Sequence, residues 1–241
     1  KKAEEMAQQR EIFREGAAKS GIGQAKADEV FDLMEKFAGY GFNKSHAAAY
    51  ALLAYHTAWV KVHCTAEFYA ANMTVELDDT DKLKLLLADA KQFNVSFEPP
   101  DVNRGAYRFE PVSDTVVRYG LGAIKGTGQG AIEAILEARG STPFVSLFEF
   151  AARVDRQRVN KRVVEALIKA GAFDALHGDR ASALASVSLA FDWAEAQEVN
   201  EHQGGLFDFA DSHAASTQEP ALVKTEPWSI KERLTAEKSA L

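Results

Sequence analysis

Residues 118–139 read RYGLGAIKGTGQGAIEAILEAR, and this stretch decides the fold of the second half of the chain. Glycines at positions 122, 126, 128 and 130 separate a short apolar turn from a longer run with helical spacing. The pattern predicts a helix, a tight hairpin and a second helix, with Gly126 and Gly128 reversing the chain through positive φ. Backbone N–H groups at the start of the second helix would then be free to bind a phosphate oxygen, which the helix dipole also favours.

Two other interpretations of this hairpin stay open at this point. The Gly126-x-Gly128 spacing also belongs to dinucleotide-binding loops, but no long buried strand of a βαβ unit surrounds it. A plain helical hairpin inside a core would need no ligand at all. A helix-hairpin-helix that holds nucleic-acid backbone without reading bases fits the pattern better.

Composition and charge limit what the chain does as a whole. Its 241 residues fit one large or two modest domains, and the net charge of −7 argues against a general nucleic-acid coat. Residues 118–169, however, hold nine basic and five acidic side chains, which is what a local phosphate contact needs. The single cysteine, Cys64, excludes a disulfide framework and a zinc site of four thiolates. A single cysteine also suits the reducing cytoplasm, where we expect the protein, and no apolar run is long enough for a membrane span, so no membrane contact is expected.

Helical spacing dominates residues 1–93. Helices are expected at 3–18 and 24–38, from Ser45 to His63, and from starts at Thr65 and Thr80. The apolar residues of the second helix would face a core; they are Ala27, Val30, Phe31, Met34 and Phe37. Both ends of the chain resemble helix interiors, which suggests part of a longer protein.

The pattern changes after Pro99 and Pro100. Two short strands are expected at 106–110 and 115–120, joined by a turn at 111–114. Helices should follow at 144–154, from Asn160 to a stop at Gly171, and over 180–199. Residues 200–227 are polar and rich in glycine and proline, which is typical of a mobile loop.

Two features of this half are candidate contacts. A basic segment follows the hairpin and is either a solvated helix face or a second contact to nucleic-acid backbone; its cations are Arg153, Arg156, Arg158, Lys161, Arg162 and Lys169. Within the expected loop, residues 203–209 read QGGLFDF. This island either binds an apolar pocket of a partner or packs back onto the preceding helix.

Five blocks, in order along the chain, carry a resemblance to a known family. They are GFNKSHAAAYALLAYHTAWVKVH at 41–63, PPDVN at 99–103, YGLGAIKGTG at 119–128, ALIKAGAFD at 166–174 and QGGLF at 203–207. The chain thereby resembles the α subunits of bacterial DNA polymerase III, the family C replicative polymerases. The resemblance implies a mainly α fold: a helical fingers segment, then an α+β domain with a short β-hairpin and a helix-hairpin-helix unit.

The resemblance also implies an organisation and partners. Residues 1–97 would end the fingers, 98–225 would form the domain that contacts the sliding clamp, and 226–241 would lead to a missing OB-fold. The helix-hairpin-helix would occupy about 118–175 and the mobile loop about 200–225. The implied partners are duplex primer–template DNA, a deoxynucleoside triphosphate, the β sliding clamp and other polymerase III holoenzyme subunits.

The resemblance further implies roles for particular residues. Lys44, Ser45 and His46 would contact the triphosphate, and Gln203, Leu206 and Phe207 would bind the clamp. Duplex DNA would be held by a larger set, which is Lys125, Gly126, Thr127, Gly128, Gln129, Gly130, Arg158, Lys161 and Arg162.

No catalytic residue or metal ligand is expected in this segment. The family binds Mg²⁺ through palm aspartates that lie upstream, so the segment alone should not polymerise DNA. Asp78, Asp79 and Asp81 are interpreted as caps and turn formers, and His56 and His63 as packing residues. Two alternatives remain: an error-prone paralogue of the same family, or a non-enzymatic DNA-repair module with a helix-hairpin-helix.

Overall fold

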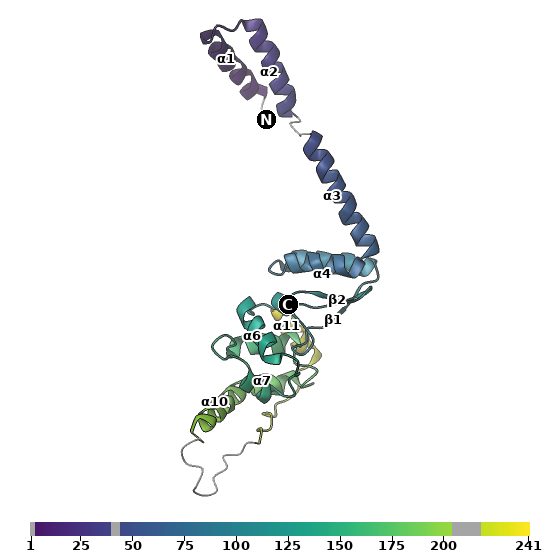
Figure 1. Ribbon diagram of the computed structural model, residues 1–241, viewed down its shortest axis with the longest axis vertical. Helices are drawn as coiled ribbons and strands as arrows, with labels where there is room; N and C mark the ends of the chain where they lie inside the picture. Colours follow the sequence, from purple (N-terminus) through teal and green to yellow (C-terminus); the bar gives the residue numbers. More distant parts are fainter. Residues whose placement is uncertain (1–2, 40–43, 204–217) are drawn as a thin grey trace. The chain divides into compact units, whose positions relative to one another are not determined.

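The computed structural model describes residues 3–39, 44–203 and 218–241 (Figure 1). The fold is mainly helical with one small three-stranded sheet, which confirms the predicted fold class. The chain divides into two compact units, Lys1–Trp59 and Val60–Leu241, and each is described by itself. Among the described helices, none is long and apolar enough to cross a bilayer.

The first unit begins with a two-helix hairpin. Helices α1 (Ala3–Lys19) and α2 (Gln24–Gly39) match their expected bounds and are joined by a turn in which Gly21 has a φ of +76°. Their seam is narrow: it buries Ala17, Ala27 and Phe31, and ion pairs between the helices border it.

The apolar face expected on α2 is wrong for three of its five residues. Ala27 and Phe31 are buried one turn apart against α1, but the side chains of Val30, Met34 and Phe37 are exposed. A single partner helix covers only one stripe of α2, so the wider apolar face has no cover in this unit. Helix α3 (Lys44–His63) begins one residue before the expected cap and contains no buried residue.

In the second unit, α4 (Thr65–Val75) and α5 (Thr80–Gln92) start where the sequence predicts. A polar cluster ties the end of α3 to them: Lys61 Nζ lies 2.6 Å from Asp89 Oδ2, and the Tyr69 hydroxyl donates to the same oxygen at 2.7 Å. The Lys61 ammonium, and then the Tyr69 hydroxyl, hold the pKa of Asp89 below its ordinary value. Asp79 caps α5 by accepting from the Lys82 N–H, as expected for a cap.

The sheet has the strand order β1-β3-β2 and differs from the prediction. Strand β3 (Val116–Arg118) lies where a strand was expected, and it pairs in parallel with β1 (Ser96–Glu98), which the sequence did not predict. The other predicted strand, at 106–110, is wrong, because β2 (Glu110–Ser113) occupies the residues assigned to the turn. Strand β2 is antiparallel to β3, with an irregular register between Pro111 and Ser113.

The remaining elements form the body of the second unit, below α4 in Figure 1. They are the 3₁₀ turn η1 (Leu121–Ala123), α6 (Gln129–Arg139), α7 (Leu147–Arg153), α8 (Lys161–Ala170), α9 (Arg180–Ala185), α10 (Val187–Gln203) and α11 (Ile230–Ala240). Their shared core includes Phe144, Phe148, Phe150 and Phe173. The Phe150 ring meets the rings of Phe144 and Phe173 edge to face. The core also includes residues of α4, α5 and the sheet. Residues before and after position 97, the expected end of the fingers segment, therefore pack in one core.

The single helix expected over 180–199 is two helices, α9 and α10, that meet at Ser186. The buried Ser186 hydroxyl donates to the Ser182 carbonyl and accepts from the Val223 N–H at 2.8 Å. The segment around Val223 is thereby bound at the break between the two helices. A second contact to this segment has the opposite direction, because the Ser146 hydroxyl donates to the Glu219 carboxylate at 2.7 Å. The later part of the expected mobile loop is therefore held against the core by hydrogen bonds.

Helix α11 is docked onto the core by the buried Arg180. Its guanidinium donates to Asp174 at 2.7 Å, to Glu237 of α11 at 2.8 Å and to the Lys169 carbonyl at 3.2 Å. A capping box formed by Ser229 and Glu232 starts the helix. The last turn of α11 also accepts a hydrogen bond, from the Lys125 N–H to the Ala240 carbonyl at 2.8 Å.

His177 gives the second unit a pH-dependent contact. The Leu147 N–H, at the start of α7, donates to His177 Nε2 at 3.0 Å, which requires a neutral ring. Burial lowers the pKa of His177 below 6.5, and the opposing charge of Glu219 is too weak to reverse the shift. The unfolded chain binds this proton more readily than the folded chain does. The contribution of the neutral His177 ring to stability should therefore be complete above about pH 7 and should decrease as the pH falls through 6.5.

The change His177→Gln should therefore flatten the pH dependence of stability between about pH 7.5 and pH 5.5. Gln keeps an acceptor for the Leu147 N–H but does not titrate. Urea unfolding of both proteins across this range measures the difference in slope, and equal slopes would exclude His177 as the titrating group.

Candidate nucleic-acid interface

The hairpin turns at Gly126, whose φ of +87° lies in the left-handed region, as predicted. Thr127 holds the turn from inside, because its buried hydroxyl donates to the carbonyls of Ile124 and Leu121 at 2.6 and 3.0 Å. The Thr127 N–H also donates, to Ile124 at 3.2 Å. The Thr127 hydroxyl is therefore already bonded within the turn, and a contact from it to DNA would have to replace these hydrogen bonds.

Gly128 differs from its expected conformation. Its φ of −76° and ψ of 154° are extended, so the prediction of a positive φ is wrong here. Gly128 is instead the N-cap of α6, and its carbonyl accepts from the N–H groups of Ala131 and Ile132. No side chain caps the helix.

The start of α6 is open to a ligand. In the described part of the chain, the N–H groups of Gly128, Gln129 and Gly130 have no acceptor. A Cβ added at Gly128 or Gly130 would meet nothing within 4 Å, so a phosphate can approach this backbone closely. The arrangement offers free donors at the positive end of a helix dipole.

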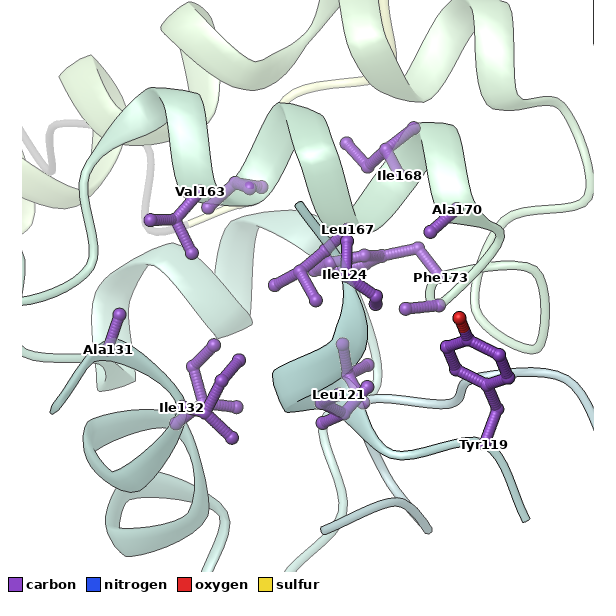
Figure 2. Packing of buried hydrophobic residues seen from close by; sticks show 14 of the residues in the cluster. Tyr119, Leu121, Ile124, Ala131, Ile132, Val163, Leu167, Ile168, Ala170 and Phe173 are labelled. Carbon is purple, nitrogen blue, oxygen red and sulfur yellow. The ribbon is translucent and has the colours of Figure 1, made fainter. Parts of the chain in front are cut away.

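Helix α8 lies against the hairpin and fixes its position (Figure 2). It begins at Asn160, which accepts from the Val163 N–H at 3.1 Å, and ends at Gly171 with a φ of +89°, both as predicted. Its buried side chains include Val163 and Leu167, which point toward the hairpin side chains in the close-up. The polar face of α8 is left to solvent.

Three of the nine cations in residues 118–169 serve the fold. Arg153 donates to the carbonyls of Ala138 and Thr142 at 2.7 and 2.8 Å and lies over the Phe144 ring. Arg139 donates to two carbonyls of the segment between β1 and β2, those of Gly105 and Val102, at 2.7 and 3.1 Å. Arg118 pairs with a carboxylate of β1. These side chains are positioned to hold loops rather than a ligand.

Three more cations are paired with carboxylates at the surface. Arg156 pairs with Glu198 of α10, Arg158 lies 2.7 Å from Glu137 of α6, and Lys161 lies 3.2 Å from Asp192 of α10. Exposed pairs of this kind contribute little stability and exchange partners readily. The proposed DNA contacts Arg158 and Lys161 are thus already neutralised in this structure.

Lys125, Arg162 and Lys169 differ from these six. None of the three side chains has a hydrogen bond or ion pair within residues 3–39, 44–203 and 218–241. Lys169 belongs to the basic segment named as a possible contact to nucleic-acid backbone, but it is not among the residues that the resemblance assigns to DNA. Its seven-residue spacing from Arg162 was the available signal, since seven residues are nearly two helical turns and place both on one face.

The structure keeps the expected nucleotide-binding residues together. Lys44, Ser45 and His46 are exposed in the first turn of α3, and the His46 ring lies 4.4 Å from the Tyr50 ring. Within the described residues, no group of three or more His, Cys, Asp or Glu side chains is arranged to hold a metal ion. Gln203 is the last residue of α10, while Leu206 and Phe207 lie outside the described residues.

Comparisons with known proteins agree with this arrangement. Residues 94–183 match the family described as a helix-hairpin-helix motif. Over its full length the chain is 50% identical to DNA polymerase III subunit alpha of Neisseria meningitidis serogroup B strain MC58. It is 48% identical to the Vibrio cholerae El Tor protein and 44% identical to the Escherichia coli K12 protein, again over its full length.

The chain spans about a fifth of the length of these relatives, since it covers 21% of each. The resemblance inferred from the five sequence blocks is therefore confirmed, and it extends over the whole chain.

Proposed function

We propose that this chain is a segment of the catalytic α subunit of a bacterial replicative DNA polymerase, and that its helix-hairpin-helix holds duplex DNA. The observation that carries the second part is the open start of α6, where three backbone N–H groups beside the Gly126 turn have no acceptor among the described residues. Such donors bind a phosphate oxygen of any sequence. Full-length similarity to DNA polymerase III subunit alpha supports the first part.

The segment would position DNA rather than carry out nucleotidyl transfer. The whole subunit would act as a DNA-directed DNA polymerase in replication, with Mg²⁺ held by aspartates outside this segment and supplying charge stabilisation for the transferring phosphoryl group. Residues 1–97 would end the fingers and 98–225 would face duplex and clamp. The similarity to polymerase subunits favours this role over that of a separate DNA-repair module.

Further contacts complete the proposal. Lys44, Ser45 and His46 form the exposed first turn of α3, which suits a triphosphate because a cation, a hydroxyl and a helix start lie together. Gln203, Leu206 and Phe207 would bind the β sliding clamp, and other holoenzyme subunits would join the complex in the cytoplasm.

The change Gly130→Ala should test the hairpin as the phosphate contact. An alanine fits at this position without a clash and favours the helix, so stability should be unchanged or rise by up to about 1 kcal/mol. Its methyl group would hinder a phosphate at the bare N–H groups, and duplex affinity should fall about tenfold, or about 1.4 kcal/mol. Fluorescence anisotropy with several labelled duplexes measures the loss.

The matched control is Gly16→Ala, which places the same change on the exposed surface of α1 with nothing within 4 Å. It should leave duplex affinity unchanged. The loss at Gly130 should be equal for duplexes of different sequence, because backbone donors read no bases. An affinity unchanged by Gly130→Ala would contradict the hairpin as the contact.

A further inference from the structure

A hollow lies beside the hairpin, between the Gly126 turn, the polar face of α8 and the last turn of α11. It has a volume of about 380 Å³, and its polar walls are Lys125, Asn160, Arg162, Glu165, Lys169 and Ser239. Ala166 of α8 closes it toward the turn, since a Cβ added at Gly126 would lie 4.0 Å from the Ala166 Cβ. Gly126 of the turn lines the hollow, whereas the residues at the start of α6, Gly128 to Gly130, do not.

The cations of this hollow are Lys125, Arg162 and Lys169, the three of the nine in residues 118–169 whose side chains have no partner among the described residues. Arg162 is exposed and has no ion pair among the described residues, whereas the ammonium of its neighbour Lys161 lies 3.2 Å from Asp192. One carboxylate, Glu165, also lines the hollow, and it makes no ion pair with Lys169 one turn away. The walls therefore carry three positive charges against one negative charge, an excess that favours an anion.

The three cations come from two elements that the core fixes. Arg162 and Lys169 are seven residues apart on α8, so they point to the same side about 10 Å apart along the helix axis. The opposite side of α8 is buried, which holds both in place. Lys125 faces them from the hairpin, and its own N–H is fixed by the Ala240 carbonyl at 2.8 Å.

We propose that this hollow binds a second backbone phosphate of the duplex, one distinct from the phosphate held at the start of α6. Lys125, Arg162 and Lys169 supply its positive charge, and Glu165 limits its affinity. The inference rests on the proposed function of the hairpin, and it assigns the outer face of α8 to the same duplex. Two fixed phosphate contacts set the direction of the DNA axis, which a single contact cannot do.

The double change Arg162→Ala with Lys169→Ala should weaken duplex binding about tenfold at moderate salt, because charge-assisted contacts to one phosphate are lost. The slope of log affinity against log salt should become shallower by about 1, since one fewer phosphate is neutralised. Titrations of the full chain with a labelled duplex at several salt concentrations measure both values.

Two matched variants sharpen this test. Lys84→Ala removes an exposed cation of α5, which is paired with Asp81, and should change affinity less than about twofold. Glu165→Gln removes the single negative charge of the hollow and should tighten duplex binding by about two- to threefold. A Lys84 effect as large as that of the double change would indicate a diffuse charge effect and overturn the proposal.

The hairpin variant separates this inference from the proposed function. If Gly130→Ala weakens binding and the double change does not, the hairpin assignment stands and the hollow is not a DNA contact. If the double change weakens binding and Gly130→Ala does not, the hollow holds the duplex and the hairpin assignment is wrong. If neither Gly130→Ala nor the double change weakens duplex binding, both the hairpin assignment and the hollow assignment are wrong.

Inorganic phosphate tests the source of the anion. Added at constant ionic strength, up to about 10 mM, it should not displace the duplex from the unmodified chain, because the hollow gains affinity from the connected backbone. Displacement from the unmodified chain but not from the double variant would assign the hollow to free phosphate and overturn the DNA assignment.

Discussion

Replacing Gly120 by alanine should cost the second unit about 3 kcal/mol or more of unfolding free energy. A Cβ at this position would lie 2.7 Å from the Arg108 carbonyl carbon and the Phe109 nitrogen, and 2.8 Å from the Tyr107 oxygen. All three are backbone atoms, so no side-chain rotation relieves the contact. Gly120 has ordinary extended dihedrals, φ −70° and ψ 131°, and the cost therefore comes from space alone.

The same change should also disturb the hairpin, because this crossing positions it. The Leu121 N–H donates to Ala106 at 2.8 Å, and the Gly122 N–H donates to Tyr107 at 2.9 Å, directly after Gly120. Urea unfolding followed by circular dichroism measures the loss, with Gly130→Ala as the control that keeps or gains stability. A Gly120→Ala protein within 1 kcal/mol of the unmodified chain would show that the two segments can separate at little cost.

Helix positions were predictable because their signals are local. The helix α8 is bounded by a side-chain cap at Asn160 and a left-handed residue at Gly171, and apolar residues recur between them at helical spacing. Each signal lies within a few residues of its effect. The hairpin turn at Gly126 was found in the same way.

The sheet could not be predicted because its strands are short and depend on distant partners. Strand β1 has three residues and pairs with β3, which lies about twenty residues later. Pro111 indicates a turn in the sequence, yet β2 is an edge strand, where a missing N–H is tolerated. Strand periodicity over three or four residues carries too little information to outweigh these signals.

Which cations of the candidate site are paired also depends on distant residues and could not be predicted from the sequence. Sequence located the basic segment, but it could not separate paired cations from free ones. Lys161 and Arg162 are adjacent, yet only Lys161 meets a carboxylate, 31 residues away on α10. Packing between helices therefore decides which cations of the segment are paired with a carboxylate.

Changing both Leu206 and Phe207 to alanine should reduce affinity for the β sliding clamp more than 100-fold, or by more than about 2.7 kcal/mol. A short peptide binds a pocket mainly through a few apolar anchors, and each such anchor typically contributes 2 kcal/mol or more. Gly204 and Gly205 carry no side chain that could add an apolar contact, so Leu206 and Phe207 would carry most of the affinity.

The neighbouring Phe209→Ala is the matched control, since it removes an aromatic ring from the same segment but outside the anchor pair. It should change clamp affinity less than about threefold. Titration of the full chain with the clamp measures all three proteins, and affinity unchanged by the double change would exclude this segment as the tether. The loss should depend little on salt, whereas duplex binding should weaken steeply as salt rises, because apolar anchoring releases no counterions. Such a tether lets individually weak DNA contacts give a long residence on DNA, because the clamp raises their effective concentration.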